Sequence, residues 1–159
     1  MIIILTFSII CAVLLVAFLF FLFLKALHRS DVYEFKDFHK TDVPYITLEV
    51  QGIPLNLLVD TGCGISILQA GVAEMLSHEK SLREVDLEAL TSDSLSAEVI
   101  SVPITLGKQT ITEDFALYDK DNFANFQSHY GITLHGLLGT EFFEKTGCCI
   151  DYSRHALII

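Results

Sequence analysis

An uncharged apolar run at the start of the chain sets the strongest constraint on its fold. Residues 2–24 contain no Asp, Glu, Lys or Arg, and all 20 acidic and 10 basic residues follow them. At about 1.5 Å per residue, a helix of this length spans roughly 35 Å, which exceeds a hydrocarbon core of about 30 Å. The sequence therefore predicts a transmembrane anchor over residues 1–24, with residues 2–24 in contact with the lipid bilayer.

A cleaved signal peptide is the alternative interpretation of this run. Signal peptides normally carry Lys or Arg before a shorter apolar region and a small-x-small cleavage site after it, and the chain lacks these features. The basic residues nearest to the run all lie on its C-terminal side: Lys25, Arg29, Lys36 and Lys40. The positive-inside rule then predicts a single-pass membrane protein whose remaining residues lie on the cytoplasmic side.

The segment after the run mixes charged and aromatic residues without a helical or strand period, so residues 25–43 are interpreted as a juxtamembrane linker. Beyond residue 30, 20 acidic residues face 8 basic ones, and this negative charge argues against a nucleic-acid partner. The cysteines and histidines show neither CxxC spacing nor another metal-ligand pattern. The sequence thus predicts neither a metal site nor a disulfide framework.

Short β-rich runs separated by turn residues begin at Pro44. We expect hairpins at 45–50 with 53–59, at 99–106 with 110–118, and at 148–152 with 155–159. We also expect a strand at 85–90, loops at 91–96 and 119–130, an apolar segment at 132–138 that Gly139 ends, and short helices at 70–78 and 141–145, the second capped by Thr140. Residues 44–159 are therefore predicted to form one all-β domain, a closed or sandwich-like barrel with one or two short helices.

The segment LLVDTGCGISIL (57–68) carries one carboxylate, Asp60, at the end of an apolar strand. An Asp-Thr-Gly turn can be purely structural, because Asp accepts backbone N–H bonds and Gly lets the chain reverse. The apolar residues on both sides favour a second interpretation, in which the carboxylate emerges from the core on a tight turn where burial tunes its pKa.

This segment, together with GLLGTEFF (136–143) and CCIDYSRHALII (148–159), resembles the retropepsin-like aspartic proteases, the single-lobe relatives of pepsin. In that family an apolar-apolar-Gly strand lies beside the catalytic turn, and residues 137–139 match it. The resemblance covers about residues 44–159. It implies a membrane-anchored member of the family, with a single-lobe acid protease barrel behind the transmembrane helix.

The resemblance also implies a mechanism and a set of site residues. Asp60 is the catalytic acid/base, Thr61 links the two active-site loops by hydrogen bonds, and Gly62 lets the backbone approach the substrate. Because the chain has one such aspartate and too few residues for two lobes, a homodimer is implied, with an Asp60/Asp60 dyad that activates water. The residues implied to lie at the peptide substrate are Gly64, Leu95, Leu138 and Gly139, of which Gly139 also supports the loop from beneath.

The sequence departs from the family pattern at several positions. Cys63 stands where the family usually has Ala, either as a packing residue or as an oxidation-sensitive thiol. Retroviral members have an acid at position 64 and an Arg in the segment at 140–141, so the ion pair that supports their dimers is absent. The expected flap, 89–98, contains no glycine.

These departures leave three hypotheses of different classes. The first is an active endopeptidase that cleaves peptides or proteins without a metal or organic cofactor. The second is a catalytically inactive module of the same fold that binds a peptide or partner protein at the membrane. The third is a membrane-tethered β scaffold unrelated to proteases. An aspartate at the two-fold axis of a dimer distinguishes the first two from the third.

Overall fold

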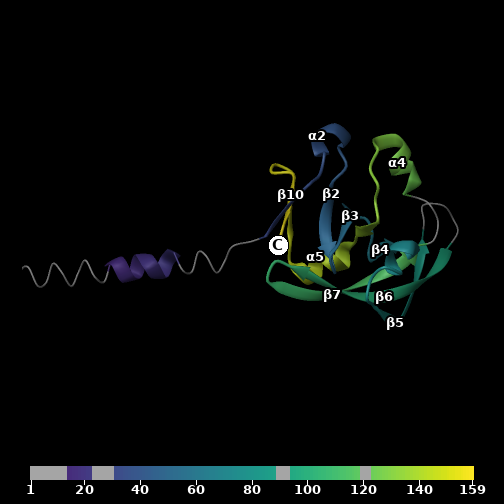
Figure 1. Ribbon diagram of the computed structural model, residues 1–159, viewed down its shortest axis with the longest axis horizontal. Helices are drawn as coiled ribbons and strands as arrows, with labels where there is room; N and C mark the ends of the chain where they lie inside the picture. Colours follow the sequence, from purple (N-terminus) through teal and green to yellow (C-terminus); the bar gives the residue numbers. More distant parts are fainter. Residues whose placement is uncertain (1–13, 23–30, 89–93, 119–122) are drawn as a thin grey trace, which may run out of the picture. The chain divides into compact units, whose positions relative to one another are not determined.

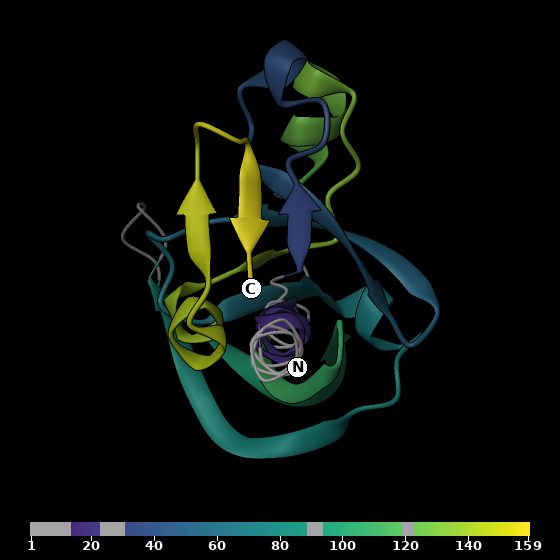
Figure 2. The same cartoon turned by 90° about the vertical axis from the view of Figure 1, so that its left-hand side faces the viewer.

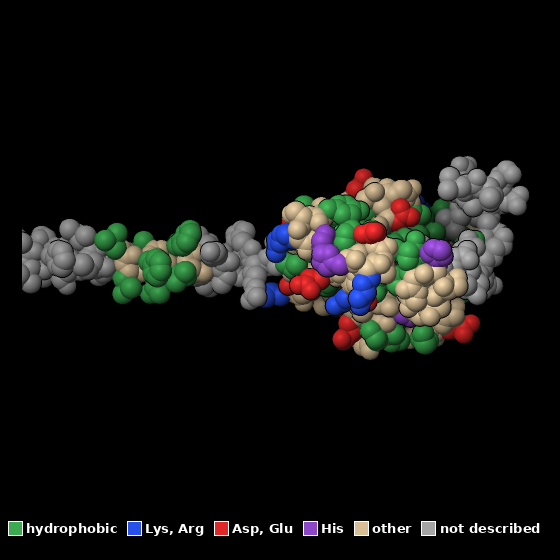
Figure 3. Space-filling model, turned by 90° about the horizontal axis from the view of Figure 1, so that it is seen from above, with side chains coloured by type: hydrophobic (Ala, Val, Ile, Leu, Met, Phe, Trp, Pro, Cys, Tyr) green, Lys and Arg blue, Asp and Glu red, His purple; other side chains and the backbone are tan. Residues whose placement is uncertain are grey.

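The computed structural model describes residues 14–22, 31–88, 94–118 and 123–159. The chain divides into two units, Met1–Ser30 and Asp31–Ile159. In the first unit, residues 14–22 are helical, and Figure 3 shows apolar side chains along this helix. Among the described residues, no helix is both long and apolar enough to cross a membrane. Most of the predicted span 2–24 lies outside the described residues.

The unit Asp31–Ile159 is mostly β, as the sequence predicts (Figure 1). Its strands are β1 (Val32–Glu34), β2 (Tyr45–Val50), β3 (Ile53–Val59), β4 (Ser66–Gln69), β5 (Glu79–Glu88), β6 (Ser94–Leu106), β7 (Gln109–Tyr118), β8 (Gly136–Leu138), β9 (Cys149–Asp151) and β10 (Ala156–Ile158). Its helices are α2 (Phe38–Thr41), α3 (Ala70–Ala73), α4 (Ala124–Tyr130) and α5 (Thr140–Thr146). The described part of this unit thus has four short helices, where one or two were predicted.

The strands form two sheets, one of seven strands in the order β2-β3-β8-β4-β7-β6-β5 and one of three in the order β1-β10-β9. Within the described residues, β2 and β5 are the edges of the larger sheet, so strand pairing leaves it open. Strand β8 lies between β3, to which it is parallel, and β4, to which it is antiparallel. The chain that leaves β3 must therefore pass around the end of β8 before it returns as β4.

The three predicted hairpins are confirmed. In the first, Val50 pairs with Ile53, and the two residues between them, Gln51 and Gly52, both have positive φ angles of 53° and 82°. A two-residue turn with both φ angles positive matches the right-handed twist of the flanking strands. This local geometry explains why the sequence alone located the hairpin.

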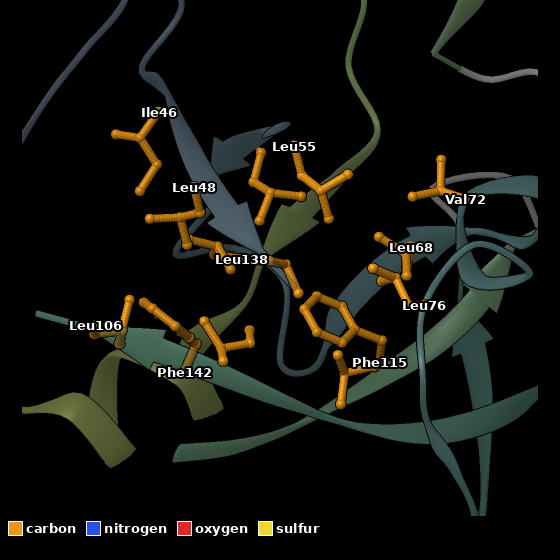
Figure 4. Packing of buried hydrophobic residues seen from close by; sticks show 14 of the residues in the cluster. Ile46, Leu48, Leu55, Leu68, Val72, Leu76, Leu106, Phe115, Leu138 and Phe142 are labelled. Carbon is orange, nitrogen blue, oxygen red and sulfur yellow. The ribbon is translucent and has the colours of Figure 1, made fainter. Parts of the chain in front are cut away.

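The main core lies between the larger sheet, α5 and α3 (Figure 4). Strand β3 buries alternate side chains, Leu55, Leu57 and Val59, because successive side chains of a strand point to opposite faces. Phe115 of β7 and Phe142 of α5 are among the largest fully buried side chains. Helix α5 is therefore fixed to the sheet by the packing of its apolar face.

Several elements differ from their predictions. Strand β5 begins at Glu79, before the strand expected at 85–90, and β6 begins at Ser94, inside the loop expected at 91–96. The helix expected at 70–78 ends at Ala73. Beyond it, the Met75 and Leu76 N–H groups each bond to the carbonyl three residues earlier, as in a 3₁₀ turn. Residues 124–130, expected in a loop, form α4, and within the apolar segment 132–138 only Gly136–Leu138 forms a strand, β8. A separate apolar cluster flanks α4, and no local period reveals it: Val43, Tyr45, Phe123, Ile132 and Leu134.

The predicted linker also differs from the structure, because its second half belongs to the folded unit. Strand β1 pairs with β10, and Val32 lies opposite Ile158 (Figure 2). Phe35 is only 6% exposed and packs in the main core. The folded unit thus begins at Asp31 and not at residue 44. A local pattern could not show this, because the pairing partner of β1 is at the far end of the chain.

Candidate active site

Asp60 follows β3 directly, at the point where the chain turns around the end of β8. Its backbone N–H donates to the Leu138 carbonyl at 3.1 Å, so the turn is bonded to β8 itself. The Asp60 side chain is half-buried, and its Oδ1 accepts the Gly62 N–H at 2.9 Å. The second carboxylate oxygen has no hydrogen bond from the described residues. We call residues 60–65 the Asp60 loop.

The tip of the Asp60 loop faces outward. Thr61, Gly62 and Gly64 are exposed. A side chain at position 62 would place its Cβ 3.1 Å from the Asp60 Oδ1, which is closer than ordinary van der Waals contact. Glycine at this position therefore lets the backbone N–H approach the carboxylate closely. No such crowding exists at Gly64, where an added Cβ would meet nothing within 4 Å.

The first turn of α5 holds the Asp60 loop from the other side. The Thr140 N–H donates to the Cys63 carbonyl at 2.7 Å, and the Glu141 N–H donates to the Gly64 carbonyl at 3.0 Å. The Thr140 hydroxyl lies within hydrogen-bond distance of the Thr61 carbonyl, at 3.2 Å, and of the Cys63 carbonyl, at 3.1 Å. The free N–H groups of a helix start are thus satisfied by loop carbonyls.

This arrangement corrects the expectation that Thr140 caps α5. Gly139 occupies the N-cap position with φ −93° and ψ 179°, and no side chain caps the helix. Thr140 is instead the first residue of the helix and bonds to the Asp60 loop. A hydroxyl side chain before a short helix is an ordinary capping signal. Here the Thr140 hydroxyl bonds to carbonyls of the Asp60 loop, and only the tertiary structure shows that this loop lies beside it.

Two glycines allow β8 and β4 to lie side by side. A Cβ on Gly139 would lie 2.5 Å from the Ile65 carbonyl carbon and oxygen, and a Cβ on Gly136 would overlap the Ile67 carbonyl oxygen. Contacts this short do not occur between real atoms, so both positions need glycine for close backbone approach. Gly139 therefore allows β8 to approach the loop closely, and it also occupies the N-cap of α5, so a role in supporting the loop and a role in starting the helix both fit its position.

The other predicted substrate contacts are placed differently. Leu138 is fully buried in the main core and Gly139 is buried against β4, so neither faces a substrate in this chain. The backbone of Leu95, expected in an exposed flap loop, lies in β6 opposite Leu87, and its side chain is outside the described part. Leu138 is buried because β8 is a central strand whose three residues are all buried, so that neither face of the strand is left exposed.

Cys63 lies beside the carboxylate as a protonated thiol. Its Sγ donates to the Ile65 carbonyl at 3.0 Å. Burial raises the pKa of the Cys63 thiol, and the negative charge of Asp60 raises it further. Because the thiolate is the reactive form, this environment suppresses oxidation and favours the packing role over an oxidation-sensitive one.

Sequence reasoning missed a buried polar group next to the loop. Glu113 of β7 is 0% exposed and bonds to Ser66 and Lys145. Burial raises the pKa of Glu113, whereas the hydrogen bonds from Lys145 and Ser66 lower it. Strand alternation contained the signal, because Glu113 is in phase with Ile111 and Phe115, both of which point into the core.

A second missed contact joins β5 to α5. Arg83 donates to both carboxylate oxygens of Glu141, from Nη1 at 2.8 Å and from Nη2 at 2.6 Å. The hydrogen bonds from Arg83 lower the pKa of Glu141. Glu141 lies in the segment, 140–141, at which the expected dimer ion pair is absent. In the structure, Glu141 forms its ion pair with Arg83 of the same chain.

Comparisons with known proteins identify no family for the chain. No family model matches it, and no curated protein matches it. Among solved structures, the EIAV protease complexed with the inhibitor HBY-793 is similar at a TM-score of 0.45 and 19% identity, over 66% of this chain and 88% of that chain. In the described parts of the chain, no group of His, Cys, Asp or Glu residues could hold a metal ion.

Proposed function

We propose that this protein is an aspartic endopeptidase that acts as a homodimer, with Asp60 of each copy forming the catalytic pair. The observation that carries the proposal is the setting of Asp60. A half-buried carboxylate emerges from a buried strand on a loop that β8 and α5 fix by backbone hydrogen bonds. Acid–base catalysis requires this combination of a fixed backbone and an accessible carboxylate.

The chemistry follows from bringing two such carboxylates together. Two carboxylates about 3 Å apart cannot both be ionised, so the pair shares one proton. The ionised carboxylate takes a proton from water, which attacks the peptide carbonyl carbon, and the protonated carboxyl donates to the carbonyl oxygen. The carboxyl that took the proton from water then gives it to the amide nitrogen, while the other carboxylate takes a proton from a hydroxyl of the intermediate. The C–N bond breaks, which releases the acid and amine products and restores the pair. These steps need neither a metal nor an organic cofactor.

The dimer is supported by the exposed tip of the Asp60 loop. Thr61 and Gly62 are both exposed in the single chain, so a second copy can contact them. In the smaller sheet, β10 already pairs with β1 on one side and with β9 on the other, so a second copy cannot add a strand beside β10. Membrane anchoring through residues 2–24 belongs to the same proposal, since confinement of two chains to one bilayer raises their effective concentration.

The decisive experiment compares the full-length wild type with Asp60→Asn on a mixture of synthetic peptides, from pH 4 to pH 7.5. Glu49→Gln is the matched control, because it removes an exposed carboxylate on β2. We expect cleavage by the wild type and the control and none by Asp60→Asn. Sedimentation of the same samples reports the oligomeric state. Cleavage that persists in Asp60→Asn, or a folded dimer that cleaves nothing, contradicts the proposal.

The catalytically inactive binding module is the second candidate. It is favoured by the expected flap, 89–98, which contains no glycine, and by the mostly exposed side chains of β5 just before it. If neither wild type nor Asp60→Asn cleaves any peptide, and both bind the same peptides with equal affinity, this function replaces the first. Affinity lost in Asp60→Asn without cleavage would instead assign Asp60 to ligand binding.

The membrane side is a separate part of the proposal. Following the basic residues after the apolar run, the folded unit lies on the cytoplasmic side. Alkaline extraction of membranes tests the anchor, and protease accessibility in sealed vesicles of known orientation tests the side. Release of the chain by alkali contradicts the anchor, and protection in inside-out vesicles contradicts the cytoplasmic side.

A further inference from the structure

A continuous line of hydrogen bonds runs through the interior from the last turn of α5 to its N-cap. Lys145 Nζ donates to Glu113 Oε2 at 2.8 Å, and Ser66 Oγ donates to Glu113 Oε1 at 2.7 Å. Ser66 Oγ in turn accepts the Gly139 N–H at 3.0 Å. Ser66 and Glu113 are both 0% exposed, so water does not substitute for these partners.

The donors and acceptors in this line have a fixed direction. A serine hydroxyl has one hydrogen, which Ser66 gives to Glu113, and its lone pairs remain for the Gly139 N–H. The two side-chain oxygens of Glu113 accept from both sides, which an amide of the same shape cannot do. An amide would direct its NH₂ group either at the Lys145 ammonium or at the Ser66 hydroxyl.

The charges around Glu113 explain why a carboxylate is tolerated in the core. Burial disfavours its ionised form and raises the pKa of Glu113, and the Lys145 ammonium offsets part of this effect. Lys145 also donates to the Thr112 carbonyl at 2.7 Å, which holds the ammonium against β7. The neighbouring Asp114 acts in the opposite direction to Lys145 and is bonded to Ser101.

The line of hydrogen bonds ends at Gly139, and the residues on both sides of Gly139 bond to the Asp60 loop. Leu138, before Gly139, accepts the Asp60 N–H through its carbonyl, and Thr140, after it, donates to the Cys63 carbonyl. A displacement of Gly139 therefore moves the backbone at both attachments. Misplacement of a catalytic group by about 1 Å can reduce the rate by about 100-fold.

We propose that Glu113 is a positioning residue for the Asp60 loop, acting through Ser66 on Gly139 to fix the place of the Asp60 carboxylate. The inference rests on the proposed peptidase function for its kinetic consequence. Its structural part, the control of the Asp60 loop by Glu113, is independent of that function. The two parts are therefore tested by separate measurements on the same variants.

The variants are Glu113→Gln, Ser66→Ala and their combination, all in the full-length chain. Ser101→Ala is the matched control, because its hydroxyl donates to the carboxylate of Asp114 at 2.6 Å on the same pair of strands as Glu113, away from the Asp60 loop. The kinetic measurement uses the best-cleaved peptide of the synthetic mixture. The structural measurement is hydrogen exchange by mass spectrometry over residues 57–66.

In Glu113→Gln and Ser66→Ala we expect kcat to fall by about 10- to 100-fold, while KM stays within about threefold. The double variant should lose no more than the worse single variant, because both changes interrupt one line. Exchange over residues 57–66 should accelerate by about tenfold in these variants and remain unchanged in Ser101→Ala.

Loop exchange and kcat equal to those of Ser101→Ala would overturn the inference. Losses that multiply in the double variant would do the same. If the wild type cleaves nothing, the proposed function fails, and the exchange measurement alone decides the inference. If Glu113→Gln does not fold, Lys145→Gln replaces it, because that change lies at the partly exposed end of the line. Unchanged loop exchange in a folded Lys145→Gln then counts against the inference.

Discussion

The Asp60 loop and the hairpin arm formed by β5 and the facing part of β6 are constructed in opposite ways. The loop is bonded through its backbone to β8 and to the first turn of α5. The arm pairs with itself, β5 is the outer edge of the sheet, and Leu82 on it is fully exposed. The exposed edge and mostly exposed side chains of β5 are features of segments that open locally. The facing residues Ala97 and Val99 of β6 are instead buried in one cluster with Ile65 of the loop.

The two regions meet at neighbouring residues of α5. Thr140 bonds to the Asp60 loop, and Glu141 bonds to Arg83 of the arm. Helix α5 contacts the loop through main-chain groups in a partly buried setting, whereas it contacts the arm through a partly exposed ion pair. The comparison teaches that one short helix fixes the candidate catalytic group firmly and restrains the arm weakly. Substitutions in α5, at Gly139 and in the arm test this difference.

The largest effect is expected from the packing beneath the loop. Phe142→Ala removes a fully buried side chain of α5 and should reduce the free energy of unfolding by about 3–5 kcal/mol. Leu82→Ala, on the exposed face of the arm, should change it by at most about 0.5 kcal/mol. Urea denaturation of both variants measures the two values. Equal losses would remove the distinction between the two regions.

The next effect concerns close approach of the backbones. Gly139→Ala places a Cβ 2.5 Å from the Ile65 carbonyl group and should cost about 3 kcal/mol, because backbone must move. Gly71→Ala is the matched control, since its Cβ meets nothing within 4 Å and helix α3 favours Ala by up to about 1 kcal/mol. Thermal unfolding compares the two. A neutral Gly139→Ala would show that the loop adjusts more easily than its contacts suggest.

A pH effect is expected at the entry to β8. His135 Nδ1 accepts the Asn56 N–H at 2.8 Å, and burial lowers the pKa of His135. The fold thus favours the neutral ring, so this stabilisation is complete above the ordinary pKa of about 6.5 and is lost as the pH falls below it. The free energy of unfolding should fall by about 1 kcal/mol between pH 7.5 and pH 5 through the loss of this bond.

His135→Asn keeps an acceptor that does not titrate, so its stability should depend less steeply on pH than that of the wild type. His129→Asn changes an exposed histidine of α4 and should preserve the wild-type dependence. Urea denaturation at each pH gives both curves. Parallel curves for wild type and His135→Asn would exclude His135 as the group responsible.

The smallest effect on stability is expected at the arm. Arg83→Leu removes a partly exposed ion pair and should cost about 0.5 kcal/mol, with a smaller effect in high salt. Hydrogen exchange in β5 should nevertheless accelerate, because the arm loses its attachment to α5. Lys80→Leu removes the ion pair with Glu98 inside the arm and leaves that attachment intact. Equal exchange in the two variants would show that Glu141 does not restrain the arm.

The features that the sequence predicted correctly are local ones. The Gln51-Gly52 turn and the alternation in β3 led to the first hairpin, and the apolar run before Asp60 placed this residue at a strand end. Strand period and turn chemistry act over a few residues, so they are legible in a single sequence. The same local rules led to Thr140 as a helix cap, and there a neighbouring segment took precedence.

The features that the sequence did not predict depend on segments far apart in the chain. The pairing of β1 with β10, the cluster around α4 and the bonds of Glu113 each join residues distant in the sequence. Glu113 could have been recognised as a buried acid from its phase with Ile111 and Phe115. Its partners could not, because strand order decides which side chains face each other across the core.

The sequence by itself determined where the strands turn, that an apolar run precedes an acidic folded unit, and that one carboxylate ends a buried strand. Only the tertiary structure decided that β8 passes between β3 and β4 and that α5 holds the Asp60 loop. The reason is physical: backbone conformation follows from neighbouring residues, whereas close contacts between strands follow from burying the apolar faces of all of them at once.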